Sequence, residues 1–555
     1  MTETPTRAWT LPWRGLGLSS NLDASESPHP YRLREEAPGL VDFVEYSAPL
    51  SLEQTRAQAS LFPTMWAARE RVPVLFHPVH LNLYGPELEP PEALAALEAH
   101  ARAVGSAWVG NDVGWWHSRG QPFPGYLYVT PPFSDAGLAD CAAHALHVQS
   151  HLSMPLALEN PAVFARRGHW HVLDFMARLH ARTGLPLLLD LGHLLSYQLA
   201  AGLPLDAGLA DFPLERVIEL HLAGGVVTRR GGRGVYVDDH TQPVREELFT
   251  LLEWLLPRCP ALRAVTFEGD GHPREVAQLT LRRLRALVPA GPRPPLELPR
   301  VEAAPASAFT GQSAPWALFE AGYGAAEEPA GAPEADAVGL EAERDFRLAV
   351  VAEPLDRDWP LSRLVFAGTR ERLRAFTASA EFRDLFSGPE RSLGQAFSAW
   401  CHGRLREQPD EALAGVLAFE GTVSRAADAW PPDPEAPGPG HVGLTQSVRL
   451  GLFPVNLTEA LFAARALRRH LVGRAWAGEA LELSGLESLA QVVRRAAPGP
   501  WHFVMRRRGR GLEVVTVSGP LSQLLRALAR GPRAEAELEP QGLAEGAALG
   551  LLCRG

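Results

Sequence analysis

The first half of the chain is predicted to fold as a (β/α)8 barrel of the TIM type, followed by a linker and a smaller α+β domain. Short apolar segments typical of strands alternate there with longer Ala-, Leu-, Arg- and Glu-rich segments typical of helices, which favours a parallel sheet. The alternation repeats eight times within roughly 270 residues, the usual size of a closed barrel. An open, doubly wound sheet is the structural alternative.

The predicted strands are short, apolar and bounded by Gly, Pro or polar residues. In chain order they are Gly15–Ser19, Val41–Tyr46, Pro73–Leu81, Ala107–Val113, Pro155–Asn160, Pro186–His193, Val217–Gly224 and Ala264–Asp270. Helical segments lie between them, among them Glu92–Val104, Gly137–Leu152, His171–Thr183 and Arg245–Leu256. Each predicted helix therefore connects two strands that run in the same direction.

The chain of 555 residues is too long for one hydrophobic core, and its composition changes twice. Residues 1–288 carry the strand and helix alternation. Residues 289–340 are rich in Pro, Ala, Gly and Glu, which predicts a linker that is partly disordered. Periodic apolar segments resume in residues 341–555, where we expect the accessory domain.

The charge and the cysteine content of the chain limit the partners, the metal ligands and the cellular compartment that we expect. The formal net charge is −11 and no large basic block occurs, which argues against a nucleic-acid or anionic membrane partner. Four widely spaced cysteines form no CxxC pair, so any metal is expected on nitrogen and oxygen ligands in a reducing compartment. No apolar run reaches the ~18 residues of a membrane span. We expect a cytoplasmic protein.

Polar side chains that can bind metals stand at the end of nearly every predicted strand. In a barrel these ends converge on one mouth, where the active sites of such enzymes lie. Glu219 and His221 are two positions apart and therefore point to the same side of their strand. A Gly-rich segment, GGVVTRRGGRGV, is expected to form a mobile lid that leads to Asp238 and His240. The strand-end residues are Glu45, His77, His80, Asn111, Asp112, Glu159, Asn160, Asp190, His193, Glu219, His221, Glu268 and Asp270.

The number of carboxylates and imidazoles predicts a metal centre. Burying so many ionisable groups in one pocket without counter-charge is expensive, and cations relieve that cost. Carboxylate and imidazole ligands without thiolate suit iron, manganese or zinc, and their number predicts two or three ions. Any one of these residues, taken alone, is as well explained as a hydrogen-bonded loop anchor.

The motifs of the first half resemble a known family when they are read together and in order. They are VDFVEY, PVLFHPVHL, MPLALENPAVF, LPLLLDLGHLLSY, VIELHLAGG, VYVDDHTQPV and VTFEGD. The resemblance is to the multinuclear non-haem iron-dependent oxidative enzymes, which include the iron enzymes of methanobactin and 3-thiaglutamate biosynthesis. It implies a TIM barrel with two or three iron ions that uses O2 to modify a ribosomally made precursor peptide at Cys, Asn or Asp.

The resemblance also implies roles for individual residues. The metal ligands would be His77, Asp112, Glu159, Asp190, His193, Glu219, His221, Asp238, His240 and Glu268. Asp238, His240 and Glu159 would carry the catalytic roles. Two positions depart from the family pattern, since Asp112 stands where a histidine is common and His193 where asparagine is common. The first departure exchanges an imidazole for a carboxylate, which alters metal number or potential.

Segments of the second half resemble the partner proteins that hold the leader peptide for these enzymes. They are AFEGTVSRAADAW, RLGLFPVNLTEALFAARAL and WHFVMRRRGRGLEVVTVSGPLSQLLRALARG. This resemblance implies that enzyme and partner are fused, so that a separate partner protein is unnecessary; an unrelated accessory domain is the alternative. For the barrel, the alternatives are a divalent-metal isomerase or phosphodiesterase and a non-catalytic peptide-binding scaffold.

Overall fold

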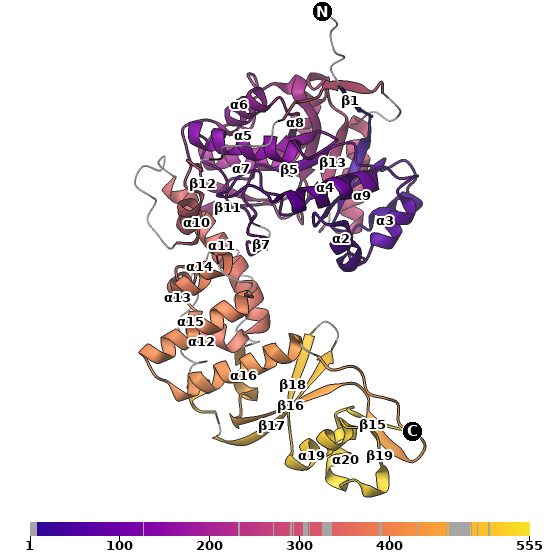
Figure 1. Ribbon diagram of the computed structural model, residues 1–555, viewed down its shortest axis with the longest axis vertical. Coiled ribbons are helices and arrows are strands. Elements are labelled where there is room, and N and C mark those ends of the chain that lie inside the picture. Colours follow the sequence, from indigo (N-terminus) through magenta and orange to yellow (C-terminus); the bar gives the residue numbers. More distant parts are fainter. Residues whose placement is uncertain are drawn as a thin grey trace, which may run out of the picture. The chain divides into compact units, whose positions relative to one another are not determined.

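The structure is a computed structural model that forms two compact units, residues 1–347 and 348–555 (Figure 1). The boundary lies beyond the predicted linker, residues 289–340. The residues described are 8–125, 127–230, 233–269, 271–288, 291, 293–303, 309, 311–324, 336–387, 391–428, 430–461, 463–464, 489, 491–496, 498–508 and 511–555. Within them, no helix combines the length and the apolar character that crossing a bilayer requires.

A closed barrel of eight parallel strands forms the first unit, which confirms the predicted fold class and excludes the open sheet. The strands are β2 (Gly15–Ser20), β3 (Phe43–Ala48), β4 (Val74–Pro78), β5 (Val109–Asp112), β8 (Leu156–Glu159), β9 (Leu187–Asp190), β10 (Val217–Ala223) and β13 (Ala264–Glu268). Each of them falls within one predicted strand or overruns its end by at most two residues. The ring closes where β13 pairs with β2.

Helices surround the barrel (Figure 1). They are α1 (Pro30–Glu36), α2 (Leu52–Gln58), α3 (Phe62–Ala68), α4 (Pro91–Val104), α5 (Asp135–Gln149), α6 (Val172–Thr183), α7 (Leu191–Ala201), α8 (Glu246–Leu255) and α9 (Arg274–Leu287). Asp190 ends β9 and caps α7, because its carboxylate accepts the backbone N–H of His193 at 2.5 Å. The cap fixes both residues at the mouth of the barrel.

The amino ends of the strands are closed by apolar side chains. Phe43, Leu75 and Trp108 pack there with Trp9 and Leu11 of β1 (Ala8–Leu11). Strand β1 pairs with β14 (Leu296–Pro299), which lies inside the predicted linker. Burial of each large side chain contributes about 1.5–3 kcal/mol, enough to order a short Pro-flanked segment.

A second part of the predicted linker also packs on the barrel. It is α10 (Pro315–Tyr323), whose Trp316 ring lies edge-on to Trp115 with centroids 5.0 Å apart. Ser313, just before α10, donates a backbone hydrogen bond to Asp140 of α5 at 3.0 Å. The Pro- and Ala-rich region therefore contains short segments whose side chains contact the barrel.

Helix α11 (Ala337–Asp358) begins in the first unit and is held there by a buried ionic group. Glu343 lies 2.9 Å from both Arg167 and Arg347, and all three side chains are at most 5% exposed. Arg347 also donates to the carbonyl oxygen of Tyr128 at 2.7 Å. The charges of the two arginines lower the pKa of Glu343 although burial opposes its ionisation.

The second unit combines helices with two antiparallel sheets, as predicted for an α+β domain. Its helices are α12 (Pro360–Ala367), α13 (Arg370–Thr377), α14 (Ala380–Ser387), α15 (Leu393–Glu407), α16 (Glu411–Asp428), α19 (Gly519–Leu528) and α20 (Pro540–Ala548). The sheets are β16 (Val448–Val455), β17 (Pro498–Arg508) and β18 (Gly511–Val517), and β19 (Arg533–Ala534), β15 (His441–Leu444) and β20 (Leu552–Arg554). Residues 462 and 465–467, at the end of the partner-like segment RLGLFPVNLTEALFAARAL, lie outside the described residues.

We predict that Glu343→Ala destabilises the barrel by about 3–5 kcal/mol, because Arg167 and Arg347 stay buried without their counter-charge. Calorimetry of the full chain would show a lower unfolding midpoint for the barrel. Glu341→Ala, which removes a partly exposed carboxylate from the same helix, is the control and should shift the midpoint little. Equal midpoints for the two variants would contradict the structural role of α11.

Candidate metal centre

Ten side chains at the mouth of the barrel form four groups, each with ligand atoms close enough to hold one ion. Within a group, one ligand atom from each residue lies within 4.8 Å of the others. The groups are Glu45–His221–Glu268, His77–Asp112–Glu159, Glu159–Asp190–His193 and Asp238–His240–Glu268. Glu268 is shared by two of the groups and Glu159 by the other two. The two pairs form one continuous cluster because Nδ1 of His221 lies 3.4 Å from Oε1 of Glu159.

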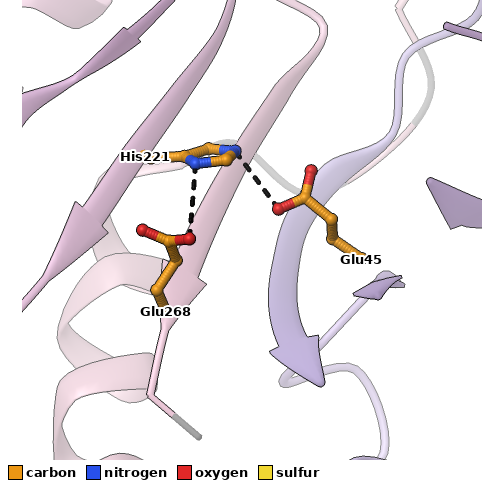
Figure 2. A group of neighbouring side chains, drawn as sticks. All are labelled: Glu45, His221 and Glu268. Atoms are coloured by element: carbon orange, nitrogen blue, oxygen red, sulfur yellow. Dashed lines mark ion pairs between the residues drawn. The ribbon is translucent and has the colours of Figure 1, made fainter. Parts of the chain in front are cut away.

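His221 of β10 lies near the middle of the cluster, between carboxylates of two other strands (Figure 2). Its Nε2 is 3.2 Å from Oε1 of Glu45, and its Nδ1 is 3.6 Å from Oε1 of Glu268. The side chain is completely buried, and neither ring nitrogen forms a hydrogen bond. A buried imidazole between carboxylates, with both nitrogens free of hydrogen bonds, suits a metal ligand.

Glu159 lies close to two strand histidines, His77 and His221, and to His193 of α7. Its Oε2 is 2.8 Å from Nε2 of His77, and its Oε1 is 3.4 Å from Nδ1 of His221. His193 is near the same carboxylate, with Nδ1 3.7 Å from Oε1 of Glu159 and 3.3 Å from Oδ1 of Asp112. The two positions that depart from the family pattern, Asp112 and His193, are therefore direct neighbours.

Asp238 and His240 reach the mouth from outside the barrel strands. The Gly-rich segment for which we expect a lid contains a hairpin of β11 (Val226–Arg230) and β12 (Arg233–Val237), and Asp238 follows β12 directly. The Oδ2 of Asp238 is 3.1 Å from Nε2 of His193 and 3.5 Å from Nε2 of His240. His240 adopts a φ of 55°, a left-handed conformation that non-glycine residues seldom adopt and that marks functional sites.

Glu219 belongs to none of the four groups, although it was among the predicted ligands. Its two carboxylate oxygens accept hydrogen bonds from the indole of Trp108 at 2.6 Å and the hydroxyl of Thr266 at 2.9 Å. It lies 3.6 Å from Nε2 of His221, so it can orient that ring. Glu45 is the reverse case, a strand-end residue that was not among the predicted ligands but lies in a group.

Asn160, a further strand-end residue, joins backbone groups and lies in none of the four groups. Asn160 makes two hydrogen bonds with the backbone of Asp190, donating to its carbonyl oxygen at 3.0 Å and accepting its N–H at 2.9 Å. Its side chain therefore joins two neighbouring strand ends. Asp270 lies outside the described residues.

Burial and the charges of neighbouring groups both shift the pKa values of residues in the cluster. Burial raises the pKa of Glu45 and of Asp112 to about 7, and that of Glu268 to about 8. Burial alone would lower the pKa of His221, but the carboxylates of Glu45, Glu159 and Glu268 hold it well above its usual range. In the absence of a cation, the site therefore recruits protons to balance its negative charge.

The donor set fits metal ions. Seven carboxyl groups, including Glu219, face four imidazoles among the described residues of the mouth, so even four imidazolium ions would leave negative charge unbalanced. Oδ2 of Asp190, Oδ2 of Asp238 and Oε2 of Glu268 are buried without a hydrogen-bond partner. Cations shared through Glu159 and Glu268 would satisfy these atoms. Oxygen and imidazole ligands suit iron, manganese or zinc.

Comparisons with known proteins identify relatives of the first half of the chain. A family model described as "RiPP precursor modification enzyme MbnB/TglH/ChrH" matches residues 15–286. A UPF0276 protein of Bordetella parapertussis is 31% identical over 267 residues, which cover 47% of this chain and 90% of the relative. A UPF0276 protein of Caulobacter vibrioides is 30% identical over 266 residues, covering 47% and 89%.

Two solved structures also resemble the first half of the chain. A xylose isomerase domain protein from Planctomyces limnophilus has a TM-score of 0.32 and 13% identity, covering 50% of this chain and 95% of its own. Endonuclease IV from Thermus thermophilus has a TM-score of 0.31 and 21% identity, covering 49% and 98%.

The different surroundings of Glu45 and Glu219 give a prediction. Glu45→Gln should lower the number of bound metal ions per chain, because it removes a carboxylate from a ligand group. Glu219→Gln should keep the number of ions at saturation and weaken their affinity by about 10–100-fold, as expected for a residue that orients a ligand. Elemental analysis combined with metal titration checks both. An unchanged metal count in Glu45→Gln, with ions lost in Glu219→Gln, would reverse the assignment.

Proposed function

The chain belongs to the family of RiPP precursor modification enzymes MbnB/TglH/ChrH, and on that basis we propose that it oxidises a ribosomally synthesised peptide with iron and O2. The observation that carries the proposal is the continuous cluster at the barrel mouth. Glu159 and Glu268 each serve two ligand groups, and bridging carboxylates are what a site for several ions requires. The proposed content is two or three iron ions per chain.

Iron is supported by the chemistry of the ligands. The groups offer carboxylate and imidazole donors, and the four cysteines of the chain lie in none of them. Iron held by these groups would supply one-electron chemistry with O2, which zinc does not offer. In the oxidation, electrons leave the peptide side chain and O2 is reduced.

The residues of the cluster are proposed to have different roles, according to their position in it. Glu159 is fully buried at the centre and holds His77 and His221 in place. Asp238 and His240 belong to the outer part of the cluster, and the His240 side chain is 28% exposed. We assign these two residues to the side of the cluster that faces the substrate, where they orient the reacting group.

A groove beside the cluster offers room for a peptide. It has a volume of about 970 Å³ and begins at Ser47 and Val79, which follow the ligand-bearing positions of β3 and β4. Leu50, Pro86 and Trp115 contribute apolar surface, and Glu87 and Arg119 lie on its wall. A mixed lining of this kind suits an extended peptide segment leading to the reacting residue.

The second unit is proposed to recognise the precursor peptide. The resemblance of its segments to partner proteins motivates this role, and covalent attachment would give the module a high effective concentration at the barrel. In this arrangement the second unit, residues 348–555, recognises the peptide and no separate partner protein is required.

We predict that Asp238→Ala and His240→Ala each lower the iron content and abolish modification of the peptide. Both remove donors from the group that they share with Glu268. The neighbouring Asp239→Ala is a matched control, because the Asp239 carboxylate is engaged with the backbone N–H and the hydroxyl of Thr241 instead. The measurements are iron per chain and the mass change of a precursor peptide encoded nearby.

Specific results would contradict this function. Full iron content and full activity in both variants would refute their assignment. Full occupancy by zinc or manganese without iron, after aerobic purification, would favour a divalent-metal isomerase or phosphodiesterase. Failure to bind any transition metal would favour a peptide-binding scaffold.

A further inference from the structure

Tyr128 contacts one of the four ligand groups from outside. It lies between β7 (Gln121–Pro122) and α5, away from the strand ends where the ligands were expected. Its hydroxyl donates a hydrogen bond to Oδ1 of Asp112 at 3.3 Å. Asp112 is 5% exposed and shares its group with His77 and Glu159. A tyrosine that the strand pattern did not single out therefore contacts the metal centre directly.

The hydrogen of this hydroxyl is directed towards Asp112. The phenolic oxygen of Tyr128 accepts the backbone N–H of Ala162 at 2.6 Å. That bond uses the hydroxyl as an acceptor, so its own hydrogen is left for a second partner. An ionised carboxylate only accepts hydrogen bonds, and Oδ1 of Asp112 is in place to receive this one. The two bonds together fix the orientation of the hydroxyl.

His193 is a second neighbour of the same carboxylate oxygen, but its hydrogen goes elsewhere. Nδ1 of His193 is 3.3 Å from Oδ1 of Asp112. The same nitrogen is 2.9 Å from the carbonyl oxygen of Asn160, which can only accept a hydrogen bond. Because Nδ1 carries one hydrogen at most, the carbonyl oxygen receives it. The hydroxyl of Tyr128 is therefore the donor that orients Asp112.

Tyr128 is itself held by contacts on several sides. Its ring lies against that of Trp116, with centroids 4.4 Å apart. It also approaches the backbone of Gly114 so closely that a Cβ at Gly114 would lie 2.5 Å from Cδ2 of Tyr128. The carbonyl oxygen of Tyr128 accepts a hydrogen bond from Arg347 of α11 at 2.7 Å. A side chain held in this way is preorganised to present its hydroxyl to Asp112.

We propose that Tyr128 is a positioning residue of the metal centre, which orients the Asp112 carboxylate for the ion held with His77 and Glu159. Carboxylates that bind metals are themselves hydrogen-bonded, and loss of such a partner typically weakens metal binding by about 10–100-fold. A histidine at position 112 would bring an N–H donor of its own, whereas a carboxylate depends on a neighbouring donor. The assignment rests on the proposed metal centre and extends it to a residue outside the ligand groups.

The test compares Tyr128→Phe with the wild type in a titration of the metal-free full chain with Fe2+ in the absence of oxygen. Loss of the hydroxyl should weaken the binding of one ion by about 10–100-fold and keep the number of ions at saturation. The same titration with Co2+ adds a spectroscopic measurement. The visible absorption bands of Co2+ should shift in Tyr128→Phe, because they depend on the arrangement of the ligands.

Two further variants separate orientation of Asp112 from a general effect on the fold. Tyr84→Phe is the matched control, because Tyr84 is fully buried and its hydroxyl contacts Oγ of Ser313 at 2.9 Å, outside the ligand groups. Its metal affinity and Co2+ spectrum should equal those of the wild type. In an Asp112→Ala background, Tyr128→Phe should not weaken the binding of the remaining ions, because the partner of the hydroxyl is gone.

Tyr128→Phe keeps the ring and its contact with Trp116, and calorimetry of the metal-free variant checks that it folds. A lower unfolding midpoint with unchanged metal affinity and an unchanged Co2+ spectrum would overturn the proposal. So would an equal loss of affinity on Tyr128→Phe with and without Asp112.

This proposal and the proposed reaction can be told apart. A wild type that binds metal but oxidises no peptide would refute the reaction, while weaker metal binding in Tyr128→Phe would still support the role of Tyr128. Failure of the wild type to bind any of these ions would overturn both.

Discussion

The structure of the first unit depends on the balance of charge at the barrel mouth. Parallel strands bring their carboxyl ends together, and in this chain nearly every end carries a carboxylate or an imidazole. The carboxylates outnumber the imidazoles, and most of these side chains are buried. Such a site is stable only with added positive charge, which protons or metal ions supply.

Much of the fold could be predicted because strand, turn and helix signals are local. Eight apolar segments separated by helical segments were sufficient to predict the barrel. The roles of β14 and α10 could not be predicted, since both lie in a Pro- and Ala-rich segment and depend on contacts with residues far away in the sequence. Glu343 illustrates the limit, because only the folded chain shows that it pairs with Arg167.

The sequence was sufficient to predict which residues gather at the candidate site. It was not sufficient to predict how deep in the barrel each side chain lies. The spacing of Glu219 and His221 correctly placed both side chains on the inner face of one strand. Two residues along a strand amount to about 6–7 Å, however, so Glu219 lies one layer deeper, where Trp108 and Thr266 hold its carboxylate. Glu45 belongs to a different strand, β3, and its carboxylate lies beside the ring of His221.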